Sequence, residues 1–152
     1  MRPAYLIPAI VAGVLALSAC GESAPAAPAG PAAPVPTLEE LPAPYNEADV
    51  ETGKGLFGRQ CAACHYLVAD KGHLVGPNLH GVFERGTGKA AGYAYSNALK
   101  NFEHPAWTPD LLEQWLLAPQ GFVPGTSMFF NGIKDPMERR ALIAYLLIET
   151  RK

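Results

Sequence analysis

The segment Cys61-Ala62-Ala63-Cys64-His65 places two thiols three positions apart and an imidazole directly after the second thiol. This spacing is typical of an attachment site for a c-type haem. Each thiol adds to one vinyl group of the porphyrin, and a single helical turn gives the two sulfurs the separation that this requires. His65 would then lie under the ring, where an imidazole nitrogen can bind the iron. The motif therefore predicts one haem c, covalently bound through Cys61 and Cys64.

A Cys-x-x-Cys segment can also be a redox-active dithiol of the thioredoxin kind, which needs a strand–helix–strand context. Nothing before Cys61 has the pattern of a strand, and His65 has no role in a dithiol site. The dithiol is the alternative interpretation, and it predicts a protein without haem.

The first twenty residues have the pattern of an export signal. Met1-Arg2 gives a short positive start, and residues 4–17 form an almost unbroken apolar run of fourteen residues. That run is shorter than the about 20 residues of a membrane span and suits a signal peptide. Its end, Leu17-Ser18-Ala19-Cys20, resembles the lipobox of bacterial lipoproteins, in which the cysteine is acylated and becomes the new amino terminus. We therefore expect lipidation at Cys20 and a domain on the periplasmic side of a bacterial membrane; an uncleaved N-terminal anchor is the alternative.

Residues 21–45 are rich in alanine and proline, with seven prolines among residues 21–44. Such a composition cannot bury enough apolar surface to fold, and its prolines favour extended polyproline II. We expect a disordered tether that reaches on the order of 70 Å at ~3.1 Å per residue.

A domain at residues 46–152 follows the tether. It carries eleven Lys and Arg against eleven Asp and Glu. No basic stripe with interleaved aromatic residues is present, so nucleic acid is not an expected partner. We expect a monomer.

Capping and periodicity predict a domain made only of helices and loops. Asn46 as N-cap starts a helix over residues 46–60, and Ser96 caps a short turn at 96–101. Thr108-Pro109-Asp110 opens a third helix that ends before Pro119, and Asp135-Pro136 opens the last one, which runs to Glu149. Residues 122–132 are predicted to be a loop.

Two helical faces are expected to meet in this all-α domain. Gly53 and Phe57 share one face of the first helix, and Leu142 and Tyr145 share one face of the last. The glycine costs about 1 kcal/mol relative to alanine inside a helix, which is tolerable where another helix crosses closely.

Two loop residues are candidates for the haem environment. A metal-bound imidazole usually donates its second ring N–H to a fixed acceptor, and the rigid Gly76-Pro77 turn can hold a carbonyl still. Met128 lies in a loop between Pro124-Gly125 and two aromatic residues, which makes it the best candidate for a second axial ligand. Met137 is the rival, in the first turn of the last helix. The remaining histidines, His73, His80 and His104, are expected to be solvated or hydrogen-bonded rather than ligands.

Taken together, the domain resembles class I mono-haem cytochrome c, the mitochondrial and bacterial electron-shuttle type, in a membrane-tethered, lipoprotein-like form. The resemblance covers essentially all of residues 46–149. It rests on the haem motif, on Gly76-Pro77-Asn78-Leu79-His80-Gly81, on Pro124-Gly125-Thr126-Ser127-Met128, and on Gly53, Phe57, Tyr93, Tyr95, Trp107 and Tyr145.

The resemblance implies a role for individual residues. Cys61 and Cys64 form the thioethers, His65 and Met128 are the axial ligands, and the Pro77 carbonyl accepts from the His65 ring. Arg85, Tyr95 and Trp107 contact the buried propionate region. Ser127 stands where the mitochondrial proteins have a lysine, and the lysine-rich docking face of those proteins is not reproduced.

The function that the resemblance implies is one-electron transport, without enzymatic catalysis, in a bacterial respiratory or photosynthetic chain. Electrons would arrive from a cytochrome bc-type complex and leave to a terminal oxidase or another acceptor. One alternative is an electron-transfer subunit of a larger redox complex. Another is a haem peroxidase or sensor, which would need an open distal site with an acid–base residue in place of Met128.

Overall fold

The computed structural model describes residues 34–151, and residues 1–33 and 152 lie outside this description. The chain divides into two units, residues 1–32 and 33–152, and the described residues belong to the second. The predicted signal peptide, Cys20 and the first part of the predicted tether therefore lie outside the described residues. Among residues 34–151, no helix is long and apolar enough to cross a membrane.

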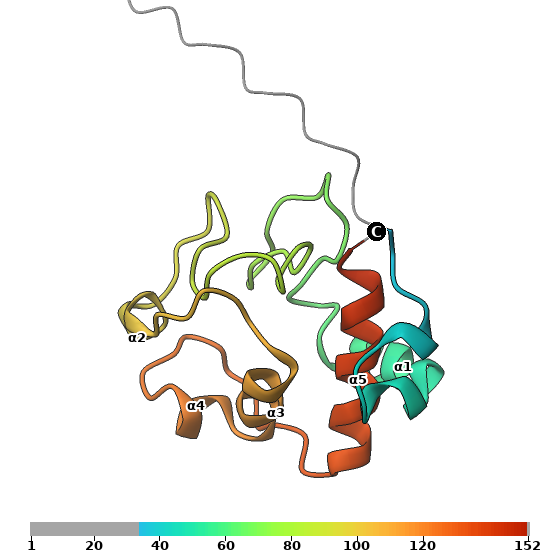
Figure 1. Ribbon diagram of the computed structural model, residues 1–152. Coiled ribbons are helices and arrows are strands. Elements are labelled where there is room, and N and C mark those ends of the chain that lie inside the picture. Colours follow the sequence, from blue (N-terminus) through green and yellow to red (C-terminus); the bar gives the residue numbers. More distant parts are fainter. Residues whose placement is uncertain (1–33, 152) are drawn as a thin grey trace, which may run out of the picture. The chain divides into compact units, whose positions relative to one another are not determined.

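The described residues form five α-helices and two short 3₁₀-helices joined by irregular chain (Figure 1). In chain order the elements are η1 Leu38–Glu40, η2 Tyr45–Glu47, α1 Val50–Gln60, α2 Asn97–Asn101, α3 Pro109–Leu117, α4 Pro119–Phe122 and α5 Pro136–Glu149. No strand occurs among these residues, which confirms the all-α prediction.

Helices α1 and α5 pack closely against each other at one edge of the domain (Figure 1). Gly53 makes this possible, because a Cβ there would lie 2.1 Å from the carbonyl oxygen of Ala141. Beside it, the rings of Phe57 and Tyr145 pack with centroids 5.8 Å apart. Leu142 is fully buried. The predicted meeting of these two helical faces is confirmed.

Three helices begin with the N-cap that the sequence predicts. The side chains of Ser96, Thr108 and Asp135 each accept a hydrogen bond from a backbone N–H in the first turn of α2, α3 and α5. Proline occupies the start of α3 and of α5, where its missing N–H would have had no helical partner. Pro119 ends α3 as expected and starts α4, a single turn that was not predicted.

The predicted start of the first helix is wrong. Asp49, and not Asn46, is the N-cap of α1, and its carboxylate accepts from the backbone N–H of Thr52 at 3.0 Å. Asn46 belongs to the separate 3₁₀-helix η2 instead. Both side chains can cap a helix, but Tyr45 is buried in the core and Asn46 lies beside it in η2, which ends before α1 begins.

The predicted disordered tether over residues 21–45 is wrong for residues 38–45. Leu41 and Tyr45 are buried in the hydrophobic core, and η2 packs against α5. Burial raises the pKa of the Tyr45 hydroxyl to about 12, with smaller contributions from Glu113 and Asp110. We call residues 37–47 the N-terminal strap.

Candidate cofactor site

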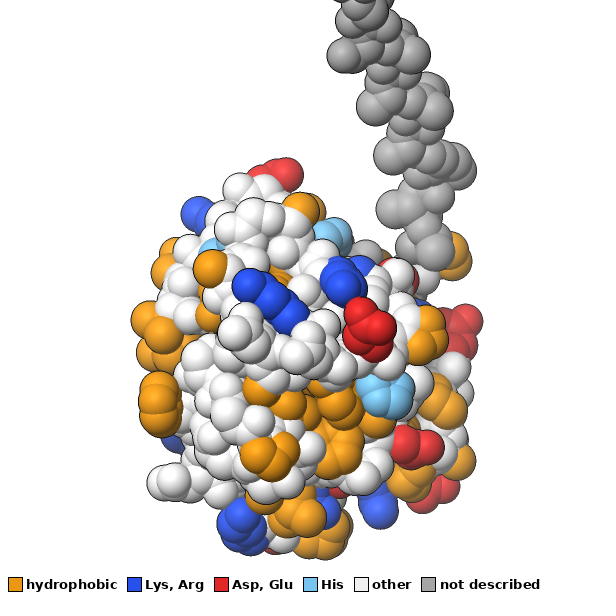
Figure 2. All heavy atoms as spheres, turned by 90° about the vertical axis from the view of Figure 1, so that its left-hand side faces the viewer, with side chains coloured by type: hydrophobic (Ala, Val, Ile, Leu, Met, Phe, Trp, Pro, Cys, Tyr) orange, Lys and Arg blue, Asp and Glu red, His pale blue; other side chains and the backbone are white. Residues whose placement is uncertain are grey.

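A cavity of about 240 Å³ lies within the domain and is lined mainly by apolar side chains. It brings together residues from segments far apart in the sequence, including Cys61, Cys64, His65 and Met128. Figure 2 shows one face of the domain, on which hydrophobic side chains gather near the centre with a basic side chain above them. The predicted cofactor residues Pro77, Arg85, Tyr95 and Trp107 also line the cavity.

The two cysteines lie where α1 ends. The backbone N–H of Cys61 still donates to the Phe57 carbonyl at 2.9 Å, and that of Cys64 donates to the Cys61 carbonyl at 2.9 Å. The thiols therefore follow each other around one tight turn that continues the helix. Both are free and half-buried. Burial, with a smaller effect of Cys64, raises the pKa of the Cys61 thiol to about 11.

A reactive dithiol of the thioredoxin kind needs a lowered cysteine pKa and a neighbouring sheet. The raised pKa of Cys61 and the absence of strands from residues 34–151 both argue against that alternative.

His65 is held by the loop that follows it. Its Nδ1 lies 2.7 Å from the carbonyl oxygen of Pro77, and because a carbonyl can only accept, Nδ1 carries the hydrogen and donates it. Nε2 is then the nitrogen with a free lone pair. Burial lowers the pKa of His65, an effect that the Pro77 carbonyl partly opposes. A neutral imidazole with a fixed tautomer is the form that binds a metal.

Gly76 is required by this arrangement. A Cβ at this position would lie 2.3 Å from Cε1 of His65, so any larger residue would push the ring away. The N–H of Gly76 also donates to the Cys64 carbonyl at 2.9 Å, which ties the loop to the cysteine turn.

Asn78 fixes the rest of the loop through its side-chain amide. Its Nδ2 donates to the carbonyls of Val68 and Lys71 at 2.8 and 2.7 Å, and its Oδ1 accepts from the His80 N–H at 2.9 Å. His73 adds a second tie, because its Nδ1 accepts from the Asn78 N–H while its Nε2 donates to the Ala91 carbonyl. His73 is therefore a hydrogen-bonding residue, as predicted.

Arg85 and Tyr95 present donors at the cavity wall. The guanidinium of Arg85 donates to the carbonyls of His80 and Asn78, which holds its positive charge in place. The Tyr95 hydroxyl oxygen accepts from the Ala90 N–H at 3.3 Å, so its own proton is available to an acceptor in the cavity. Trp107 is buried, with its ring centroid 5.4 Å from that of Trp115.

Met128 lies in the loop between α4 and α5, and its side chain is half-buried at the cavity wall. The sequence pattern did not identify the residue that holds this loop. The side-chain amide of Gln120 donates to the carbonyls of Thr126 and Met128 at 2.9 and 3.0 Å. Met137, the rival candidate, is 73% exposed and does not line the cavity.

The residues around the cavity fit a covalent haem. They supply two thiols in one turn, an imidazole with Nε2 free, and a thioether, and the remaining wall is largely apolar. Among residues 34–151, no three His, Cys, Asp or Glu side chains gather to hold a bare metal ion. An imidazole and a thioether are known ligands of haem iron, so this donor set suits a haem.

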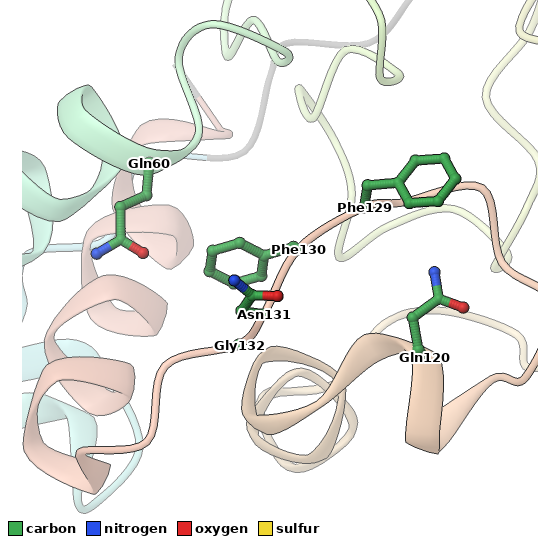
Figure 3. Close-up of a pocket in the computed structure, with 6 residues that line it drawn as sticks. All are labelled: Gln60, Gln120, Phe129, Phe130, Asn131 and Gly132. Atoms are coloured by element: carbon green, nitrogen blue, oxygen red, sulfur yellow. The ribbon is translucent and has the colours of Figure 1, made fainter.

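A second hollow, of about 400 Å³, lies beside the cavity and is lined by uncharged residues (Figure 3). They are Gln60, Gln120, Phe129, Phe130, Asn131 and Gly132. Apart from Phe129 and Phe130, which follow Met128, these residues carry no sequence signal, because they lie in loops and at helix ends where no periodicity marks them.

Comparison with known proteins gives a consistent result. The family described as Cytochrome c matches residues 50–148. Cytochrome c of Guizotia abyssinica is 45% identical over 114 residues, which cover 75% of this chain and 98% of that protein. Cytochrome c of Cochliobolus lunatus is 42% identical over 107 residues, and that of Arabidopsis thaliana is 43% identical over 105 residues. These alignments cover 70% and 69% of this chain.

Proposed function

The chain belongs to the cytochrome c family, and we propose that it is a His/Met-ligated one-electron carrier tethered to the periplasmic side of a bacterial membrane. Membership of the family makes it an electron-transfer protein with a covalent haem c and with redox partners, and not an enzyme. The axial ligands, the membrane and the electron-transfer chain are the parts that we propose.

His65 and Met128 are the axial ligands in this proposal. The observation that carries it is the 2.7 Å hydrogen bond from His65 Nδ1 to Pro77 in a cavity that Met128 also lines. That bond fixes the imidazole with Nε2 unprotonated, and the amide of Gln120 holds the backbone of Met128. Haem c bound there supplies an iron that accepts and returns one electron.

The chain's own residues set the conditions for this chemistry. The apolar wall favours the form with the smaller charge, and thioether ligation also raises the potential. Arg85 and Tyr95 offer a fixed positive charge and a hydroxyl donor to acidic groups at the edge of the ring. With His65 and Met128 holding the iron on both sides, a substrate would have no open site, which would disfavour the peroxidase or sensor alternative.

An optical spectrum of the protein from a host with haem-maturation machinery tests the ligand set. We expect sharp α and β bands after reduction, haem that stays on the chain after denaturation, and a weak far-red band in the oxidised form. Met128→Leu should remove the far-red band and leave the haem attached. A wild-type spectrum with haem but without that band would refute Met128 ligation, and no haem in a competent host would refute the whole proposal.

The proposed location rests on the apolar run at residues 4–17 and on Cys20. A carrier tethered there would take electrons from a cytochrome bc-type complex and pass them to a terminal oxidase or another acceptor. Metabolic labelling with an alkyne-bearing fatty acid tests the tether. We expect label on the wild type and none on Cys20→Ser. A wild-type protein that stays on the membrane without label would instead support an uncleaved N-terminal anchor.

A further inference from the structure

Two large apolar side chains stand exposed at the edge of the haem cavity. Val75 is 79% exposed and Phe129 is 94% exposed, and both line the cavity. Each is next in sequence to a residue of the site, since Val75 precedes Gly76 and Phe129 follows Met128. Neither side chain gains stability from burial where it lies, because almost all of the Phe129 ring and most of Val75 remain in water.

The surroundings of Phe129 are polar but uncharged. Phe129 and Phe130 point in different directions from the loop, and the side-chain amides of Gln60, Gln120 and Asn131 lie around the hollow (Figure 3). We call Gln60, Val75, Gln120, Phe129 and Asn131 the rim surface.

Charged residues are almost absent from the lining of the cavity and of the neighbouring hollow. Arg85 is the one charged residue that lines the cavity, and its guanidinium is already bound to two backbone carbonyls. No charged residue lines the neighbouring hollow. The ion pairs of the described residues lie elsewhere, between Arg139 and Glu113, between Arg151 and Glu84, and between Lys54 and Glu51.

We propose that the redox partner docks on the rim surface through an apolar, uncharged face of its own. This inference rests on the proposed function. Charge complementarity favours a partner with an uncharged face, because a charged face would lose its water here without meeting an opposite charge. The centres of protein interfaces are depleted of charged residues and enriched in exposed aromatic anchors, and Phe129 has the position and exposure of such an anchor.

The proposal has a kinetic consequence. In each encounter one electron passes from the reduced protein to the oxidised one, and no bond or proton changes place. Without charges at the contact, long-range attraction does not steer the encounter, so its rate should respond weakly to salt.

A second copy of the protein serves as the probe, because its own rim surface is an apolar, uncharged face of the required kind. Electron self-exchange between reduced and oxidised holoprotein can be measured by NMR line broadening. We expect the wild-type rate to change less than about twofold from low to high salt. Phe129→Ser should slow it by about fivefold or more, because an interface anchor is worth at least about 1 kcal/mol. Met137→Ser is the matched control, an exposed apolar residue away from both hollows, and should change nothing.

A second variant and a readout without electron transfer complete the test. Asn131→Lys places a positive charge on both rim surfaces without touching the amide that holds Met128, so its rate should fall at low salt and recover at high salt. In the fully reduced protein, raising the concentration should shift the amide resonances of the rim surface and leave those around Met137 in place.

Three results would overturn the proposal. They are a wild-type rate that falls steeply with salt, equal rates for Phe129→Ser and Met137→Ser, and a stable dimer in sedimentation, which would make a second copy the occupant. Failure of the proposed function is distinguishable, because it would appear as a missing haem or far-red band. If only the docking proposal failed, the protein would still show both spectral features, and a small uncharged reductant would still reduce it.

Discussion

Replacing Gly53 by alanine should destabilise the protein, although alanine is the better helix former. The added Cβ would lie 2.1 Å from the carbonyl oxygen of Ala141 and 2.9 Å from Cβ of Tyr145. Ordinary van der Waals contact begins at 3.4 Å, so α1 and α5 would have to separate by more than about 1 Å. The obstacle is backbone, which cannot turn away as a flexible side chain could.

The magnitude follows from two opposing effects. Overpacking typically costs about 1–3 kcal/mol, and a backbone obstacle puts this site at the upper end. The higher helix propensity of alanine returns about 1 kcal/mol. We therefore expect a net loss of about 2 kcal/mol, or roughly 10 °C in melting temperature for a domain of this size.

Gly58→Ala is the control on the same helix. A Cβ at Gly58 would meet nothing within 4 Å, so only the propensity effect should operate and the protein should gain up to about 1 kcal/mol. Denaturant unfolding of both holoproteins, followed by circular dichroism, measures the two free energies. If Gly53→Ala proved as stable as Gly58→Ala, the close crossing of α1 and α5 would be refuted.

Three further predictions address the N-terminal strap, the loop that carries Met128, and the loss of stability at low pH. Leu41→Ala should lower the free energy of unfolding by about 2–3 kcal/mol, because the side chain is buried in the core; no change in a urea titration would show that the strap does not pack there. Gln120→Ala should weaken the far-red band and lower the pH at which it disappears, because the backbone of Met128 loses its amide donor; an unchanged pH titration of that band would contradict this role. Hydrogen bonds from Thr52 hold the pKa of Asp49 below its usual 3.8, so its stabilisation is complete above that pH and is lost as the pH falls through the lowered value. The side chain of Asp49→Asn can cap the helix but does not titrate, so the free energy of unfolding of this variant should fall less steeply as the pH is lowered. Identical pH dependences for the two proteins would count against the cap.

Sequence reasoning succeeded where the structure depends on neighbours in the chain. Thr108 and Asp135 cap their helices through hydrogen bonds to N–H groups two or three residues away, which a local pattern can reveal. The cavity-lining positions of Cys61 and His65 were predictable for the same reason, because one turn after a helix carries both.

Sequence reasoning failed where contacts between residues distant in the chain determine the structure. The composition of residues 21–45 averages over many prolines and hides Leu41 and Tyr45, which are buried in the hydrophobic core where η2 packs against α5. The roles of Gln120 and Val75 were also missed. Neither lies on a periodic apolar face, and their importance comes only from the loops that the fold places beside them.

The N-terminal strap has a mechanical consequence. Leu41 and Tyr45 lie ahead of α1 and are buried in the core, and η2 packs on α5. A pull applied to the chain at residue 34 would therefore have to peel these two side chains from the core before any force reached α1, which leads into Cys61. The strap therefore protects the turn that holds the haem from tension applied to the N-terminal end of the chain.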